Sequence, residues 1–121
     1  MDMASLNTFG AILSYAIDLE AQISDYYEKL GDSAKAAEAE KRRSKLERVR
    51  RENVVEITLE PIEGLNEANY AINFDDISVS GRQAVEAAAA RFYEDVAPAI
   101  NVRQAQRALE RCGKEHSALA T

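Results

Sequence analysis

The sequence lacks several features that mark common classes of protein. A single cysteine, Cys112, among 121 residues excludes an intrachain disulfide and a cysteine metal cluster, and it favours a reducing, cytoplasmic location. There is no glycine-rich phosphate loop, no Ser-His-Asp set and no zinc-ligand spacing. Residues 1–5 carry no basic group, and Asp18 and Glu20 interrupt the apolar stretch that follows. Neither a signal peptide nor a membrane span is therefore expected.

A net positive charge is also absent. The formal net charge is −6 and the sequence pI is near 4.8, so no overall attraction to nucleic acid or to an anionic membrane is expected. The strongest basic cluster spans residues 41–51, and we interpret it as a solvated helix face offset by interleaved glutamates. The alternative is a contact for an anionic partner, either nucleic acid or another subunit. Hydrophobic residues make up 46% of the chain, enough for one core, so residues 1–121 are expected to form a single domain.

Apolar residues in the segment 6–30 recur at alternating spacings of three and four, which predicts a helix packed in a bundle. Similar patterns and the turn residues between them predict four helices, at residues 5–30, 34–55, 80–97 and 101–119. Residues 54–59 also have the composition of a short strand, but a lone strand would have no partner, so a helix end and turn is preferred. The expected fold is all-α: a four-helix bundle of two hairpins, 5–57 and 80–119, joined by a long connection, 58–79, that crosses the bundle.

Two glutamates occupy matching positions on expected apolar helix faces. Glu20 lies in the middle of the first helix, and Glu86 lies 66 residues later in the third. Each is followed seven residues on by a tyrosine, Tyr27 or Tyr93, and the second and fourth helices also match at an offset of 63 residues. A carboxylate within an apolar face is costly unless a cation, metal or donor compensates it. The repeat therefore predicts two similar hairpins whose glutamates share one interior site.

This arrangement resembles the ferritin-like superfamily, nearest its rubrerythrin-type members, in which E-x6-Y is followed about thirty residues later by E-x-x-H and both patterns then recur. The resemblance implies a ferritin-like bundle with a di-iron or di-manganese centre, and oxygen, peroxide or iron-oxidation chemistry. Only part of the ligand set is present, because Glu20 and Glu86 take the lone-carboxylate positions and His116 takes the second histidine. The other positions that can be matched hold Arg50, Asn53 and Gly113, and Asn53 is expected to be an interior partner of the charged groups. The metal site is therefore expected to be incomplete.

The arginine at a former ligand position suggests how the two glutamates are compensated. Arg50, with Arg43 as a second candidate, is the predicted interior cation, and His116 would supply a further charge or a proton. The hydroxyl groups of Tyr27 and Tyr93 would each bond a carboxylate across the site, with ordinary core packing as the alternative. The rival hypothesis is a reduced metal site in which the two glutamates and the histidine hold an iron or manganese ion.

Three classes of function remain. The preferred one is a non-catalytic ferritin-like module with a degenerate site, acting structurally or in an interaction, with no resident cofactor. The second is a metal-binding redox or iron-handling protein of the rubrerythrin kind, which would be a non-haem di-iron oxidoreductase with iron or manganese. The third is a module that binds a small molecule or nucleic acid, although a nucleic-acid or membrane partner is not expected. An exposed connection at residues 54–74 would supply apolar surface for a homodimer.

Overall fold

The computed structural model describes residues 6–53, 62 and 64–120, and in this part the chain is helical without strands. The α-helices are α1 (Phe9–Lys29), α2 (Ser33–Asn53), α3 (Val79–Val96) and α4 (Arg103–Ala120). Two short 3-10 helices, η1 (Glu67–Tyr70) and η2 (Ala97–Ala99), lie before and after α3. The expected all-α fold is confirmed, while the segment 54–59 lies outside the described residues. Among the described helices, none is both long and apolar enough to cross a bilayer.

Capping side chains determine where three of the helices begin. Thr8, Asp32 and Ser78 each accept a hydrogen bond of 3.0–3.1 Å from the backbone N–H three residues further on. Asp32 thus caps α2, which begins at Ser33. Between α1 and α2, Gly31 has a φ of +76°, a left-handed conformation that glycine adopts without strain and that ends α1.

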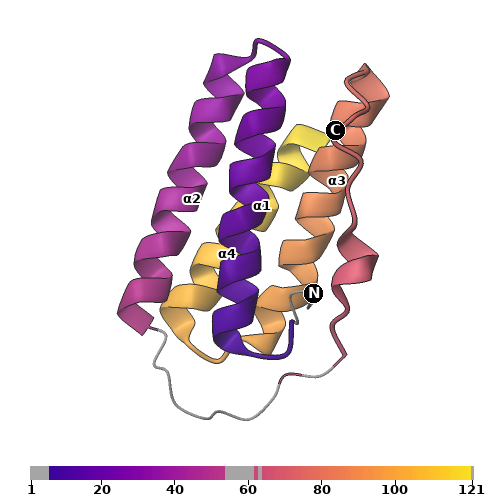
Figure 1. The fold of residues 1–121 in the computed structure, drawn as a ribbon. Coiled ribbons are helices and arrows are strands. Elements are labelled where there is room, and N and C mark those ends of the chain that lie inside the picture. The colour runs from indigo at the N-terminus through magenta and orange to yellow at the C-terminus, as the bar shows by residue number, and fades with distance from the viewer. Residues whose placement is uncertain (1–5, 54–61, 63, 121) are drawn as a thin grey trace, which may run out of the picture.

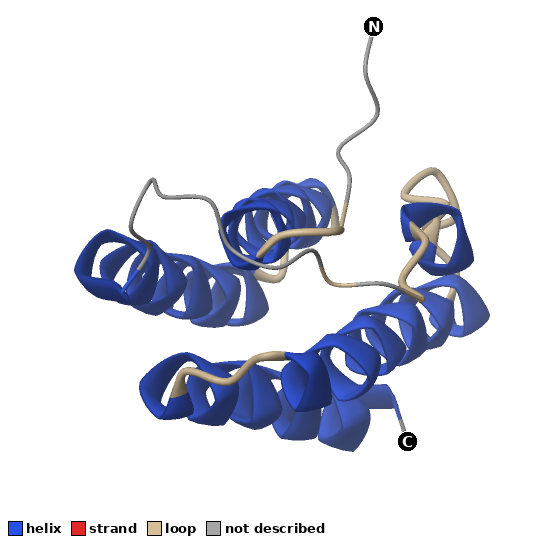
Figure 2. Ribbon diagram, turned by 90° about the horizontal axis from the view of Figure 1, so that it is seen from below, coloured by secondary structure: helices blue, strands red, loops and turns tan. Residues whose placement is uncertain are grey.

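The four helices form two layers, one of α1 and α2 and one of α3 and α4, which Figure 2 shows end-on. Within each layer the two helices run in opposite directions and pack closely, and α2 packs on α4 between the layers. In Figure 1, α1 and α4 run upward whereas α2 and α3 run downward. The segment 64–78 therefore climbs from the bottom of the bundle to the top, where α3 begins (Figure 1).

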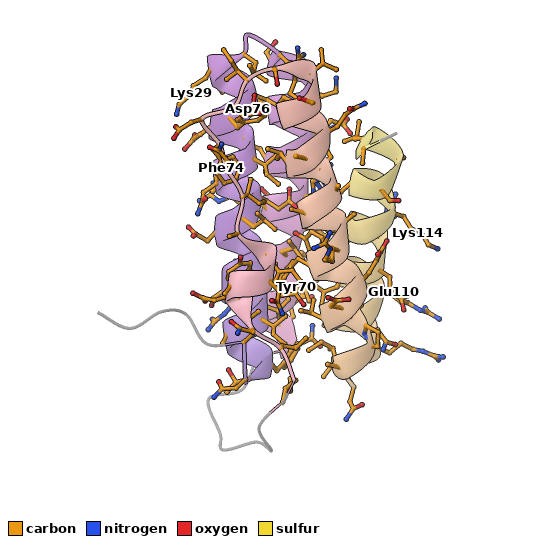
Figure 3. All side chains as sticks on the ribbon, turned by 90° about the vertical axis from the view of Figure 1, so that its right-hand side faces the viewer. Lys29, Tyr70, Phe74, Asp76, Glu110 and Lys114 are labelled. Atoms are coloured by element: carbon orange, nitrogen blue, oxygen red, sulfur yellow. The ribbon has the colours of Figure 1, made fainter. Side chains whose placement is uncertain are left out.

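The segment 64–78 packs along the side of the bundle that α1 and α3 form (Figure 3). Tyr70 is buried and donates a 2.7 Å hydrogen bond to Asp95 of α3. The ring of Phe74 lies 5.7 Å from that of Tyr26, whose hydroxyl donates a 2.6 Å hydrogen bond to the backbone carbonyl of Asp76. Within residues 64–74, Leu65, Ile72 and Phe74 thus pack against the core, whereas Ile77 just beyond them is 57% exposed. The expected homodimer stays a prediction.

Candidate functional site: a buried charge network

A cluster of ionisable side chains lies inside the bundle, with one member from each α-helix. Glu20 of α1, Arg42 of α2, Glu86 of α3 and His116 of α4 are each at most 5% exposed. The structure thus brings together the two glutamates and the histidine that the sequence singled out. Because their neighbours are apolar core residues, each charge must be compensated within the cluster.

The imidazole ring of His116 stands between the two carboxylates. Its Nε2 lies 2.7 Å from Glu20 Oε2, and its Nδ1 lies 2.5 Å from Glu86 Oε1. An ionised carboxylate only accepts hydrogen bonds, so with both glutamates ionised both ring nitrogens donate and the ring is an imidazolium. Burial alone would lower the pKa of His116, but the hydrogen bonds to Glu20 and Glu86 outweigh it and the pKa is raised. His116 is therefore an internal cation that bridges α1 and α3.

Each tyrosine of the repeated pattern bonds the glutamate of the other half. Tyr93 donates a 2.5 Å hydrogen bond to Glu20 Oε2, and Tyr27 donates one to Glu86 Oε2. Seven residues span about two helical turns, roughly 10 Å. Since α1 and α3 run in opposite directions, that spacing brings each tyrosine level with the opposite glutamate. Burial, together with the neighbouring carboxylate, raises the pKa of both hydroxyls, so both remain protonated donors.

Arg42 supplies the second internal cation. Its Nε donates a 2.9 Å hydrogen bond to Glu20 Oε1, and its Nη1 donates a 3.0 Å hydrogen bond to Glu115, which lies closer to the surface. Burial alone would raise the pKa of Glu20, but the hydrogen bond and charge of His116, followed by the charge of Arg42, outweigh it and the pKa is lowered. Two carboxylates and two cations therefore balance within the core.

The arginine in the site differs from the ones predicted. On α2 the buried side chains are Ala36, Ala39, Arg42, Leu46 and Val49. The buried face thus includes the residue immediately before Arg43 and the one immediately before Arg50. The helix is therefore rotated by about 100° from the expected orientation. Arg43 instead pairs with Glu40 at 3.1 Å and with Glu47 at 3.6 Å on a partly exposed face. The prediction that Arg43 is an interior partner is therefore wrong.

Arg50 and Asn53 also lie away from the network. The Nε of Arg50 lies 3.5 Å from the backbone carbonyl of Gly10. Asn53 donates hydrogen bonds to the Val49 carbonyl at 2.9 Å and to Gln104 at 3.2 Å, near the end of α2. The predictions that these two side chains face the glutamates are wrong, because the last two turns of α2 lie beyond the level of the cluster.

Gly113 makes room for Tyr93. A Cβ atom at position 113 would lie 3.0 Å from the Cβ of Tyr93, closer than ordinary van der Waals contact. The Tyr93 ring is fully buried and stacks on the His116 ring at 5.7 Å. The glutamate that the family resemblance would place at position 113 is therefore incompatible with the observed position of Tyr93. The neighbouring Cys112 is inert, because burial raises the pKa of its thiol to about 12.

The donor atoms of this cluster do not fit a di-metal centre. Two ligands bound to one ion at about 2.1 Å stand roughly 3 Å apart, farther than the 2.5 and 2.7 Å contacts of His116 with the glutamates. All four carboxylate oxygens of Glu20 and Glu86 already accept hydrogen bonds from Arg42, His116 or the two tyrosines. Among the described residues, no group of three or more His, Cys, Asp or Glu side chains is arranged to hold a metal ion.

The chain was also compared with known proteins. It matches none of the protein-family models, none of the curated proteins and none of the solved structures searched.

Proposed function

We propose that the chain is a ferritin-like four-helix module in which a network of charged side chains takes the place of the di-metal centre. In this proposal the module is not a catalyst, and it acts as a structural or interaction unit. We also propose a reducing, cytoplasmic location, which suits a single cysteine whose thiol is buried and protonated. Two features of the fold support the ferritin-like assignment. The connection runs the length of the bundle between two antiparallel hairpins, and the E-x6-Y pattern of α1 pairs reciprocally with that of α3.

The protonation of His116 carries the proposal. A histidine binds a metal through the lone pair of an unprotonated ring nitrogen. Both ring nitrogens of His116 face carboxylate oxygens at hydrogen-bond distance, so neither keeps a lone pair for an ion. The imidazolium and Arg42 together supply the two positive charges that Glu20 and Glu86 require. This arrangement stabilises the bundle, and it leaves no open coordination position for oxygen or peroxide chemistry.

Metal analysis of protein purified without chelators tests this proposal. We expect iron and manganese far below stoichiometry, and a thermal midpoint that neither EDTA nor added Mn²⁺ changes, because the core is already neutral. The matched control is E20Q/E86Q, which removes both carboxylates but keeps their shape. Stoichiometric iron or manganese in the native chain that is lost in the E20Q/E86Q protein would support the rubrerythrin-type alternative instead.

A further inference from the structure

The two layers meet along two sides of the bundle, and only one of these sides is covered by another described segment. The segment 64–78 covers the side formed by α1 and α3 (Figure 3). On the opposite side, α2 and α4 border two adjoining hollows of about 550 and 320 Å³, which share Lys45, Ala108 and Arg111 in their walls. We call this pair of hollows the α2/α4 groove. No described segment lies across it.

Positive charge is concentrated in the larger hollow of the α2/α4 groove. Four cations line it, Lys45 from α2 and Arg103, Arg107 and Arg111 from α4, and none of its described lining residues is a carboxylate. Val49 and Ala108 also line it but are almost fully buried, so the long basic side chains supply most of its accessible surface. The smaller hollow adds Lys41, but also Glu38 and Glu115, so the positive charge is strongest toward the start of α4.

The cations of the groove are arranged in rows. Arg103, Arg107 and Arg111 follow one another at four-residue intervals along α4, a rise of about 6 Å each, and Lys41 and Lys45 do the same on α2. Like charges at this spacing destabilise a helix. Arg103 is also the first residue of α4, where the partial positive charge of the helix end disfavours a cation. Folding of the bundle does not require this arrangement.

Two arginines elsewhere on α2 pair with glutamates, whereas Arg51 has no ion pair with the described residues. Arg43 pairs with two glutamates and Arg48 pairs with Glu52 at 3.4 Å. By contrast, Lys45, Arg103 and Arg107 have no ion pair or hydrogen bond with another described side chain. Arg111, by contrast, pairs with Glu115 at 3.5 Å. In a chain with a net charge of −6, the three cations of the larger hollow that lack such a pair indicate a binding surface for a negatively charged partner.

We propose that the α2/α4 groove binds an acidic amphipathic helix of a partner protein, an inference that rests on the interaction role proposed above. Carboxylates repeated every four residues on such a helix would match the cation rows of α2 and α4 in spacing. Its apolar residues would contact the aliphatic parts of the lysine and arginine side chains that line the hollow. The lining residues include no aromatic ring on which a nucleic-acid base could stack.

The test uses two synthetic helical peptides that share a leucine face. One carries glutamates at four-residue intervals, and the other carries glutamine at the same positions. Fluorescence anisotropy should show saturable binding of the glutamate peptide to the full chain, with affinity at least about tenfold lower for the glutamine peptide. Binding should weaken as salt rises from about 0.1 M to about 1 M, where the Debye length falls from about 10 Å to about 3 Å.

Two double variants of equal net charge locate the site. R103Q/R107Q removes groove cations, whereas R43Q/R48Q removes cations that already pair with glutamates. We expect about tenfold weaker peptide binding for R103Q/R107Q and a change within about twofold for R43Q/R48Q, with circular dichroism verifying that both remain helical. Equal effects of the two variants, or equal affinity for the two peptides, would overturn the proposal.

Two further outcomes would assign the groove to another occupant and so overturn the proposal as well. One is a single-stranded DNA oligonucleotide that binds more tightly than the glutamate peptide and loses affinity in R103Q/R107Q. The other is self-association of the chain alone at low salt, measured by sedimentation, that R103Q/R107Q abolishes. None of these results bears on the metal-free network, because Arg103 and Arg107 do not contact it. Failure of the groove proposal is therefore distinguishable from failure of the proposed function.

Discussion

The hydroxyl of Tyr93 on α3 donates a 2.5 Å hydrogen bond to Glu20 on α1. The matching tyrosine of α1 donates to the glutamate of α3, so the repeated pattern makes the same contact in both directions. A single imidazolium then joins the two carboxylates. This symmetry explains why two acidic residues remain inside a small bundle: each has a donor from the other hairpin, and together they share His116.

Removal of Arg42 should destabilise the protein strongly. Arg42→Ala leaves Glu20 without one of its two cations in the core, and breaking a buried ion pair in this way costs about 3–5 kcal/mol. We expect a loss of that size in the free energy of unfolding measured with urea. Arg42→Lys should lie in between, because an ammonium group keeps the charge but cannot contact Glu20 and Glu115 with a planar fork.

The matched control for Arg42 is its neighbour in the sequence. Arg43→Ala removes a partly exposed arginine whose pairs lie at the helix surface, so its effect should stay within about 0.5 kcal/mol. Equal costs for the two alanine variants would mean that Arg42 does not act as the internal cation.

The two tyrosine hydroxyls should contribute similarly to stability. Tyr27→Phe and Tyr93→Phe each leave one carboxylate oxygen without its phenolic donor, at a cost of about 1.5–3 kcal/mol for a hydrogen bond to a charged group. Thermal unfolding of the two variants should show closely similar losses. Tyr15→Phe is the control, because the hydroxyl of this half-buried tyrosine has no hydrogen bond with the described residues. A large cost for one variant and none for the other would contradict the reciprocal arrangement.

Stability should be greatest at mildly acidic pH. The pKa of His116 is raised above its ordinary value of 6.5, so the stabilisation that it supplies is complete below pH 6.5 and is lost as the pH rises through the folded-state pKa. The pKa of Glu20 is lowered from 4.5, so its contribution is complete above pH 4.5 and is lost as the pH falls through the folded-state pKa. A pH series of thermal midpoints should therefore be highest between about 4.5 and 6.5.

The E20Q/E86Q protein provides the control for the alkaline side of this profile. Without the carboxylates, burial is the dominant influence on His116 and lowers its pKa. The neutral histidine would then stabilise fully above pH 6.5, and its contribution would fall as the pH decreases. The slope near neutral pH should thus reverse its sign. An unchanged decline above pH 6.5 in this variant would show that another group is responsible.

Much of the fold could be predicted because the helices of this chain have clear periodicity and turns. The pair Glu86 and Tyr93 repeats the spacing of Glu20 and Tyr27, and this repeat predicted that the two glutamates share one interior site. The choice of arginine could not be predicted, because the apolar face of α2 consists largely of alanines and fixes its rotation only weakly. Arg42 and Arg43 both lie near that face, and neighbouring positions differ by about 100°.

The groove could not be predicted from the basic cluster 41–51 alone. The structure divides that cluster into cations that pair with glutamates, such as Arg43 and Arg48, and cations that line the groove, such as Lys45. It also adds the row of arginines on α4, which lies far away in the sequence. Only the packing of α2 on α4 makes these residues one surface.

Nitrogen-15 NMR of the imidazole ring tests the central claim most directly. His116 is the only histidine in the chain, so its two ring nitrogens can be assigned without ambiguity. We expect both nitrogens to carry a proton at neutral pH, with signals that do not change when Mn²⁺ is added. A neutral ring with one unprotonated nitrogen, or ring signals broadened by stoichiometric Mn²⁺, would contradict a core neutralised by an imidazolium and an arginine.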